Sequence, residues 1–407
     1  MNMKIVELNG VHRGSTGKIM FGIADELRKN GHKVWTFSPI YYQRVKQTDF
    51  PEIEGHNYFG TSFENMIHLR LAQITGFHGC FSYFGTKKLL SKIDKINPDV
   101  IHLHNLHNWT INVPLLFGYL KKKKIKVIWT LHDCWSMTGQ CPHFQIVKCD
   151  KWKYGCYNCP QIHDYPKAYV DRTKTMWKLK KKWFSGIADM TIVTPSEWLS
   201  HIVEESYLNN YSRKVINNGI DINVFSYHEN DIKKQWRDEY GDFQYLVLGV
   251  AFGWGYKKGL DIFIELSKEL PDEYKIVLVG TDDKVDRLLP EKIISIHRTN
   301  NQQELAKIYS ICDVFVNPTR EDTYPTVNLE ALACGLPVVT FNTGGSPEII
   351  DNSCGICIDI DDICGTIEAI KKICEKKIIL RENCIIKGKV ANQKDRFIDY
   401  THLIEEK

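Results

Sequence analysis

Short runs of aliphatic and β-branched residues recur along this chain, and a longer amphipathic stretch follows most of them. The runs are Lys4 to Leu8, His32 to Phe37, Asp99 to His104, Lys126 to His132, Asp189 to Thr194, Tyr245 to Val250, Lys275 to Gly280, Ile293 to His297, Asp313 to Asn317 and Pro337 to Phe341. Such alternation is typical of parallel sheets covered by helices on both faces. The sequence therefore predicts an α/β fold with two doubly wound, Rossmann-like parallel sheets.

The length of the chain favours two domains. A chain of 407 residues exceeds what one ordinary hydrophobic core organises. Asn218-Gly219 is a turn signal between the two sets of strands. We expect an N-terminal domain over residues 1–215, a C-terminal domain over residues 216–392, and a ligand cleft between them. A helix over residues 393–407, with apolar side chains at Phe397, Tyr400 and Ile404, is expected to pack back on the first domain.

The composition is that of a folded protein of a reducing compartment. Hydrophobic residues make up 43% of the chain and charged residues 25%, which are globular values. No apolar run reaches the ~20 residues of a membrane-spanning helix, and the N-terminus lacks the order of a signal peptide. Most of the 13 cysteines are scattered, unlike a disulfide framework. We expect a cytoplasmic protein.

Positive charge is concentrated in one segment. Lys121 to Lys182 holds 15 lysines and arginines against four aspartates, a balance of +11, and because the whole chain carries +4, the remainder carries −7. The segment ends in a cluster of basic and aromatic residues: Lys178, Lys180, Lys181 and Lys182 with Trp177, Trp183 and Phe184. This pattern favours the anionic inner face of the plasma membrane as a partner. Nucleic acid is not expected, because no nucleic-acid-binding motif accompanies it.

A glycine-containing loop follows the first predicted strand. Gly14 and Gly17 would let backbone N–H groups approach an anion at the start of the next helix. A tight turn between strand and helix explains the same glycines equally well. The loop is not that of an ATPase, because His12 stands where glycine is required and Ile19 replaces the hydroxyl residue that would hold magnesium.

The stretch from Asn317 to Gly345 carries the strongest functional signal. A strand ends in a polar loop, and a helix begins after Pro325 with its N-terminus directed beyond the sheet. Asp322 on the loop and Glu330 on the helix could hydrogen-bond hydroxyl groups of one ligand. A second loop of small residues, at Gly345, precedes another helix. Two solvated surface acids would explain either carboxylate alone, but not the whole arrangement.

Together these features resemble glycosyltransferase family 4, a large family of retaining, nucleotide-sugar-dependent enzymes with the two-domain GT-B fold. The resemblance covers essentially the whole chain. The family's E-x7-E motif matches Asp322 and Glu330, with aspartate replacing the usual first glutamate; its glycine loop matches Gly14 to Gly17, and its hinge region matches Asn218 to Asp221. The resemblance implies that Asp322 contacts the donor sugar, that Glu330 contacts the ribose, and that backbone amides of Thr326, Val327 and Gly345 recognise the donor.

The resemblance also implies a cationic site for the leaving diphosphate. The family's Lys-Gly pair is present as Lys258-Gly259, but the arginine expected upstream is absent from residues 251–256. Lys258 is therefore expected to stabilise the leaving phosphates, with Lys257 compensating for the missing arginine and no catalytic metal. His132 ends a predicted strand next to Asp133 and matches the family's histidine near the donor sugar. A single histidine is more often structural, but this position favours a functional role.

Five cysteines follow His132 at positions 134, 141, 149, 156 and 159. Cys156 and Cys159 have metal-ligand spacing, and with Cys141 and Cys149 they could form a structural zinc site that orders a long loop. Unlinked thiols packed under aromatic residues are the alternative; a redox pair would be expected to open a helix. Cys354 and Cys357 share the spacing but flank a predicted strand, where we expect no metal.

The predicted activity is transfer of a hexosyl residue, with retained configuration, from a UDP- or GDP-sugar to a lipid-linked glycan in bacterial surface-polysaccharide synthesis. Two alternatives stay open. A sugar-nucleotide epimerase of the same fold would change the free donor without an acceptor. A non-catalytic sugar-nucleotide-binding subunit would bind the donor and never release the nucleotide.

Overall fold

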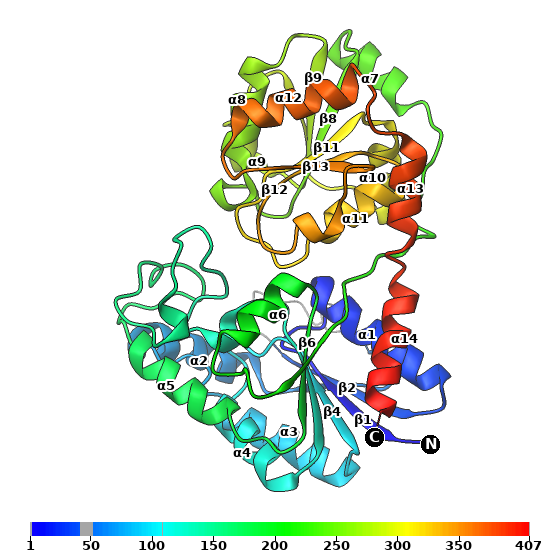
Figure 1. Cartoon of the computed structure of the whole chain (residues 1–407). Coiled ribbons are helices and arrows are strands. Elements are labelled where there is room, and N and C mark those ends of the chain that lie inside the picture. Colours follow the sequence, from blue (N-terminus) through cyan, green and yellow to red (C-terminus); the bar gives the residue numbers. More distant parts are fainter. Residues whose placement is uncertain (1, 41–51, 108, 407) are drawn as a thin grey trace. The chain divides into compact units, whose positions relative to one another are not determined.

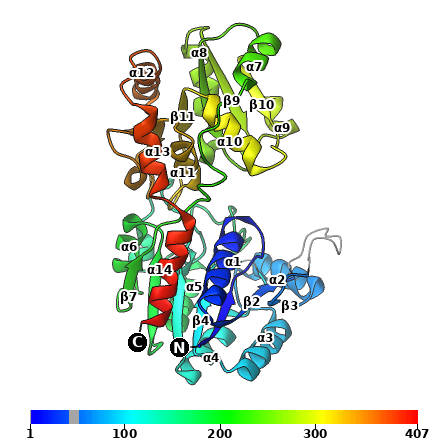
Figure 2. The same cartoon turned by 90° about the vertical axis from the view of Figure 1, so that its right-hand side faces the viewer.

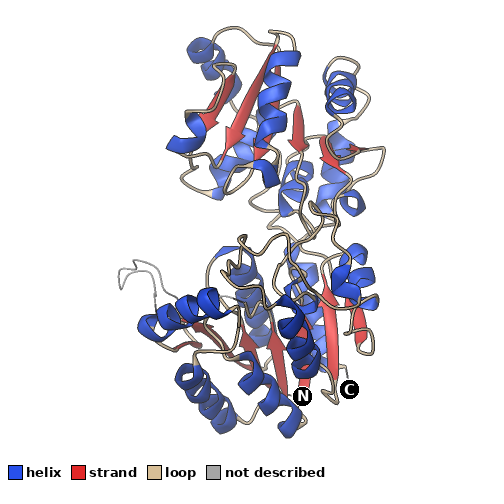
Figure 3. Cartoon of the chain, turned by 90° about the vertical axis from the view of Figure 1, so that its left-hand side faces the viewer, coloured by secondary structure: helices blue, strands red, loops and turns tan. Residues whose placement is uncertain are grey.

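The computed structural model describes residues 2–40, 52–107 and 109–406 (Figure 1). The chain divides into two compact units, residues 1–216 with 397–407 (unit 1) and residues 217–396 (unit 2). Each unit contains one parallel sheet with helices on both faces (Figure 3). The predicted α/β fold of two Rossmann-like sheets is confirmed.

Unit 1 contains a seven-stranded parallel sheet of order β3-β2-β1-β4-β5-β6-β7. Its strands are β1 Lys4–Leu8, β2 Lys33–Pro39, β3 His56–Phe59, β4 Val100–Leu103, β5 Lys126–Thr130, β6 Met190–Thr194 and β7 Ser212–Val215. Its helices are α1 Gly14–Lys29, α2 Ser62–Thr75, α3 Tyr83–Ile96, α4 Val113–Lys123, α5 Thr173–Phe184 and α6 Glu197–Glu204. The strand order reverses between β1 and β4, and ligands of such sheets bind at the carboxyl ends beside this point.

Helix α14 (Gln393–Glu405) covers part of one face of the unit 1 sheet, beside α1 (Figure 2). Its buried residues Tyr400, Leu403 and Ile404 share one hydrophobic cluster with Ile5 of β1 and Val100 of β4. Phe397 packs so closely on α1 that a Cβ atom added at Gly22 would lie 2.2 Å from its ring. The core of the first unit is therefore completed by residues from the far end of the sequence.

Unit 2 contains a six-stranded parallel sheet of order β10-β9-β8-β11-β12-β13. Its strands are β8 Tyr245–Val250, β9 Tyr274–Val279, β10 Ile293–Ile296, β11 Val314–Asn317, β12 Val338–Phe341 and β13 Gly355–Ile358. Its helices are α7 Ile232–Tyr240, α8 Leu260–Glu269, α9 Asp283–Asp286, α10 Gln302–Ile311, α11 Thr326–Ala333, α12 Ile363–Cys374 and α13 Arg381–Lys389. Here the order reverses between β8 and β11, so the loops after these two strands lie at the expected ligand position.

The burial of side chains on helix α5 corrects the prediction of a basic and aromatic surface cluster. Lys180, Trp177 and Phe184 are buried, and Trp183 is partly buried. These positions fall on the inward face of the helix, while the lysines on its outer face remain in solvent. The aromatic side chains pack in the core and do not form a surface that could enter a membrane. No helix among the described residues is both long and apolar enough to span a bilayer.

Candidate active site

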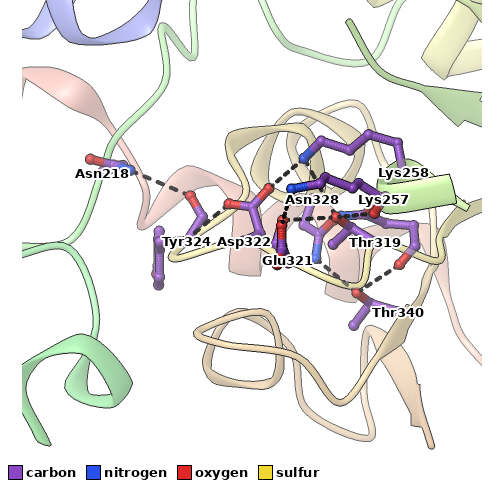
Figure 4. Close-up of polar contacts among 10 residues, drawn as sticks. Asn218, Lys257, Lys258, Thr319, Glu321, Asp322, Tyr324, Asn328 and Thr340 are labelled. Atoms are coloured by element: carbon purple, nitrogen blue, oxygen red, sulfur yellow. Dashed lines mark hydrogen bonds and ion pairs between the residues drawn. The ribbon is translucent and has the colours of Figure 1, made fainter. Parts of the chain in front are cut away.

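The connection from β11 to α11 is held by a buried amide network. Asn317, which ends β11, donates from Nδ2 to Oδ1 of Asn328 on α11 at 2.7 Å. The hydroxyl of Thr340 on β12 donates to the carbonyl of Asn317 at 3.2 Å (Figure 4). All three side chains are buried. The network fixes the N-terminus of α11 against the strand ends, so the helix dipole and its first N–H groups have a set direction.

Lys258 and Asp322 form an ion pair at the carboxyl ends of β8 and β11. Lys258 Nζ lies 3.0 Å from Oδ2 of Asp322 and 3.4 Å from Oγ1 of Thr319 (Figure 4). The other carboxylate oxygen of Asp322 accepts from the backbone N–H of Tyr324 at 3.3 Å. The side chains of Lys258 and Asp322 remain 33% and 22% exposed, so a ligand can reach both charges. Two predicted site residues from different loops thus meet.

Lys257 pairs with a carboxylate that the sequence analysis did not single out. Its Nζ lies 3.0 Å from Oε2 of Glu321, whose side chain is almost fully buried (Figure 4). The lysine itself is half exposed. Lys257, which was expected to compensate for the missing arginine, therefore already balances the charge of a buried carboxylate.

Arg320 is a second residue that sequence reasoning missed. The guanidinium is buried, donates to Asp261 of α8 at 2.7 and 2.9 Å and to Asp361 at 2.7 Å, and lies 3.9 Å from the centre of the Tyr256 ring. Burial opposes its charge, but the two carboxylates raise the pKa of Arg320 overall. The residue joins the loops after β8, β11 and β13, so it supports the loop that carries Lys258.

The remaining predicted donor residues lie around α11 and the next loop. Within residues 321–330, the partly exposed positions are Asp322, Thr326, Val327 and Glu330. Glu330 accepts from the hydroxyl of Tyr309 at 3.2 Å. Gly345 is buried between Thr343 and Ser346, whose buried hydroxyl groups have no hydrogen-bond partner among the described residues. Because such groups cost roughly 1–3 kcal/mol when unsatisfied, they indicate a place for ligand or water.

In unit 1, the two predicted glycines have different roles. Gly14 is exposed at the start of α1 with φ of 73°, a conformation that favours glycine. Gly17 is buried, and a Cβ atom there would lie 2.6 Å from the backbone of His12. Close packing of the turn therefore explains Gly17 without a ligand, whereas Gly14 is accessible to one.

His132 belongs to a buried chain of hydrogen bonds across β1, β4 and β5. Its Nε2 lies 3.2 Å from Nδ1 of His104, and Nε2 of His104 lies 3.0 Å from Glu7. The second carboxylate oxygen of Glu7 lies 3.0 Å from His102, whose other nitrogen contacts Thr130 at 2.8 Å. Glu7, His102 and His104 were not predicted as site residues, although alternate histidines on one strand were a visible signal.

The charge of Glu7 sets the tautomer of His132 through this chain of hydrogen bonds. Burial alone would raise the pKa of Glu7, but His102 and His104 outweigh it and lower the pKa to about 2. Burial and the neighbouring His102 lower the pKa of His104 to about 4, and burial lowers that of His132 to about 3. An ionised Glu7 accepts Nε2–H of neutral His104, whose Nδ1 then accepts Nε2–H of His132. Nδ1 is thus the basic nitrogen of His132.

Asp133 and His107 extend the polar edge beyond His132. Asp133 Oδ2 lies 2.7 Å from His107 Nε2, and its other oxygen accepts the backbone N–H of Trp135 at 2.8 Å. The side chains of His104, His107, His132 and Asp133 line one small cavity. The candidate histidine of unit 1 therefore lies at a strand-end hollow rather than inside the hydrophobic core.

Two family models together match most of the chain. The model for glycosyl transferases group 1 matches residues 230–391, which include Lys258, Asp322 and Glu330. The model for glycosyltransferase family 4 matches residues 17–224, more than half of the chain. The chain belongs to glycosyltransferase family 4. Its two parallel sheets are thus those of a family 4 glycosyltransferase.

Individual relatives agree with this membership. WcaC of Escherichia coli K12, named as a proposed glycosyl transferase of colanic acid biosynthesis, is 24% identical over 332 residues, which cover 80% of this chain and 78% of WcaC. An Escherichia coli UDP-Gal:alpha-D-GlcNAc-diphosphoundecaprenol alpha-1,3-galactosyltransferase is 26% identical over 270 residues, which cover 58% of this chain and 68% of that enzyme.

The fold of the present protein is also found in a solved structure. Anabaena HepE, crystallised in complex with UDP, aligns with a TM-score of 0.68 and 14% identity, covering 99% of each chain. At this identity the similarity establishes the fold alone. The GT-B fold predicted from the sequence is therefore confirmed.

Proposed function

We propose that this glycosyltransferase moves a hexosyl residue from a UDP- or GDP-sugar to a lipid-linked glycan during polysaccharide synthesis, with retained configuration. The observation that carries the proposal is the accessible pair of Lys258 and Asp322 beside the N-terminus of α11. A cation, a carboxylate and a helix N-terminus at one sheet edge match a diphosphate joined to a sugar.

In this proposal the donor separates the two members of the ion pair. The diphosphate takes the place of the carboxylate at Lys258, and Asp322 is released to accept a hydroxyl group of the sugar. Backbone N–H groups at Thr326 and Val327 and in the Gly345 loop contact the phosphates, and Glu330 binds the ribose. As the sugar leaves, Lys258 and the helix N-terminus stabilise the charge that develops on the diphosphate.

The acceptor hydroxyl is proposed to attack on the face from which the diphosphate leaves, which retains the configuration. A departing phosphate oxygen takes the hydroxyl proton, so the chain needs neither a protein nucleophile nor a catalytic metal. The basic Nδ1 of His132 accepts a hydrogen bond from a sugar hydroxyl and orients it. The lowered pKa of His132 keeps this ring neutral for that role.

Relatives support the proposed donor and acceptor. The galactosyltransferase relative is named for a UDP-sugar and a diphosphoundecaprenol-linked acceptor, WcaC for colanic acid, and HepE was crystallised with UDP. A lipid-linked acceptor would bring the protein to the inner face of the plasma membrane from the cytoplasm. The exposed lysines of α5 support attraction to that surface.

The decisive experiment incubates purified protein with a panel of UDP- and GDP-sugars, with and without diphosphoundecaprenol-linked saccharides. We expect nucleotide release that depends on the acceptor, and NMR of the product should show the anomeric configuration of the donor. An epimerase would convert the donor without an acceptor. A binding subunit would release no nucleotide under any condition.

A further inference from the structure

We infer that the insert between β5 and α5 holds a structural zinc ion, bound by Cys141, Cys149, Cys156 and Cys159 and balanced in charge by Lys180. All four cysteines are free thiols. They line one cavity of about 20 Å³, which is room for a single water-sized particle. Thiolate sulfurs around a cavity of this size are the ligand set that zinc prefers.

The four sulfurs are gathered but not yet closed around a metal. Among the described residues, ligand atoms that lie within 4.8 Å of one another form the groups Glu7–His102–His104 and Asp283–Asp286–His297. No three of the cysteine sulfurs meet this limit, whereas Zn–S bonds of about 2.3 Å place sulfurs about 3.8 Å apart. Zinc binding therefore draws the sulfurs inward, as expected where metal binding and loop ordering are coupled.

Backbone N–H groups already point at two of the sulfurs. The N–H of Gly139 donates to Sγ of Cys156 at 3.1 Å. The N–H of Gln161 donates to the sulfur of Cys159. Hydrogen bonds of this kind favour the thiolate and orient it as a metal ligand.

A set of neutral thiols does not explain why the side chain of Lys180 is buried beside them. Its side chain is fully buried, donates to the carbonyl groups of Trp135 and, at 3.0 Å, of Thr138, and lies 3.6 Å from the centre of the Trp135 ring. Among the described residues no carboxylate forms an ion pair with it. Burial lowers the pKa of Lys180 to about 7, and Asp133 acts on its charge only from beyond ion-pair distance, so a closer anion is expected to hold the ammonium form.

A zinc tetrathiolate supplies that anion, because four thiolates around Zn²⁺ carry about two negative charges. One peptide group links the two charges. Its carbonyl, from Thr138, accepts from Lys180, and its N–H, from Gly139, donates to Cys156. The ammonium polarises this peptide and so strengthens the N–H···S bond to the proposed ligand.

A redox role fits the insert less well. Cys156 and Cys159 lie in a loop after the 3-10 helix η3 (Lys151–Lys153), and the next helix begins only at Thr173. The pair therefore lacks the helix N-terminus that lowers a redox thiol's pKa. The same spacing occurs at Cys354 and Cys357, next to and on β13, and provides a matched control.

The test measures zinc in untagged protein prepared with reductant and without chelator. We expect about one zinc per chain, its loss in the Cys156→Ala/Cys159→Ala double variant, and its retention in Cys354→Ala/Cys357→Ala. Cobalt added to metal-free protein should give the visible absorption and thiolate charge-transfer bands of a tetrahedral tetrathiolate. This spectrum uses the wild-type chain, so it does not depend on the folding of any variant.

The counter-charge is tested separately. Lys180→Met should weaken zinc affinity by roughly 10- to 100-fold in a chelator competition, as outer-shell changes commonly do, while Lys181→Met on the exposed face should leave it unchanged. Wild-type protein that contains no zinc and gives no cobalt spectrum would overturn the site, as would a Cys156–Cys159 disulfide. Unchanged affinity in folded Lys180→Met would overturn the role of the lysine.

Discussion

Asp322 forms an ion pair with Lys258 and, in our proposal, also binds the donor sugar. Its replacement should therefore separate binding from turnover. In Asp322→Asn, Lys258 loses the carboxylate that competes with a diphosphate, so UDP should bind more tightly. Turnover should fall by roughly 100-fold, the scale of one lost transition-state contact. Calorimetry with UDP and initial rates with the true donor measure the two effects.

The matched control is Asp351→Asn, because Asp351 also pairs with a lysine of unit 2, at 2.8 Å from Lys387, but on an exposed edge. It should change neither UDP affinity nor turnover. Unchanged UDP binding together with a normal rate in Asp322→Asn would show that the ion pair lies outside the donor site.

Glu7 acts on His132 through His104 and is therefore a positioning residue. Glu7→Gln keeps the size of the side chain but presents an amide, which can donate to His104 and reverse the tautomers along the chain. We expect turnover to fall about 10-fold or more, with donor affinity unchanged. Nitrogen-15 NMR of His132 should show the altered tautomer.

The control is Glu54→Gln, at an exposed position of the same unit. An unchanged His132 spectrum in Glu7→Gln would contradict the proposed effect of Glu7 on His132 through His104.

At the scale of single elements, α5 is expected to hold the protein at anionic membranes by charge alone. The substitutions convert the exposed lysines of α5 to glutamine: Lys174, Lys178, Lys181 and Lys182. At about 1 kcal/mol per lysine near an anionic surface, they should weaken binding to phosphatidylglycerol vesicles by up to roughly 1000-fold. Added salt should weaken wild-type binding in the same way.

The control for α5 removes an equal charge from unit 2. It converts four exposed lysines there to glutamine: Lys268, Lys284, Lys376 and Lys377. Equal losses of vesicle binding in both variants would mean that net charge, rather than this helix, determines the attraction. Binding that survives high salt would instead require apolar insertion, which the buried Trp177 and Phe184 do not offer.

Elements differed in how far the sequence predicted them. Buried central strands such as β8 and β11 read as continuous apolar runs, because both faces of a parallel sheet are covered. The edge strands β3 and β7 were missed, since they are short and partly exposed, and β7 carries Arg213 and Lys214. Helical spacing with Met176 and Phe184 could have placed Lys180 on the inner face of α5, but its charge suggested the surface.

The sequence predicted which loops carry the candidate site, but it did not predict the contacts between those loops. The motif after β11 singled out Asp322 as a candidate, and the Lys-Gly pair singled out Lys258. Their ion pair joins residues 64 apart in sequence, which only the order of the strands brings together. Glu7 and His102 lay within runs that read as ordinary strands, so a buried polar chain could not be told from a hydrophobic core.

For the whole molecule, the two units should respond differently to acid. Burial lowers the pKa of five histidines of unit 1 to about 3 or 4: His56, His68, His78, His104 and His132. Below about pH 6.5 these histidines bind protons in the unfolded chain but not in the folded unit. The stability they contribute is thus complete above that pH and is lost as the pH falls toward 4.

We therefore expect unit 1 to unfold first on acidification, with up to about 2 kcal/mol lost per histidine between roughly pH 7.5 and pH 5. In unit 2, Asp286 raises the pKa of His297, whose contribution is present at low pH and is lost as the pH rises. Hydrogen exchange with mass spectrometry follows each unit separately. Acid unfolding of unit 2 before unit 1 would contradict the prediction.

The packing of α14 has a consequence for the order in which the protein can form on the ribosome. All seven strands of unit 1 are translated before residue 216, yet Tyr400, Leu403 and Ile404 are needed to complete the hydrophobic cluster around Ile5 and Val100. The whole of unit 2 is synthesised in between. A chain that stops after Arg396 would therefore leave apolar surface open on the half of the protein that was translated first.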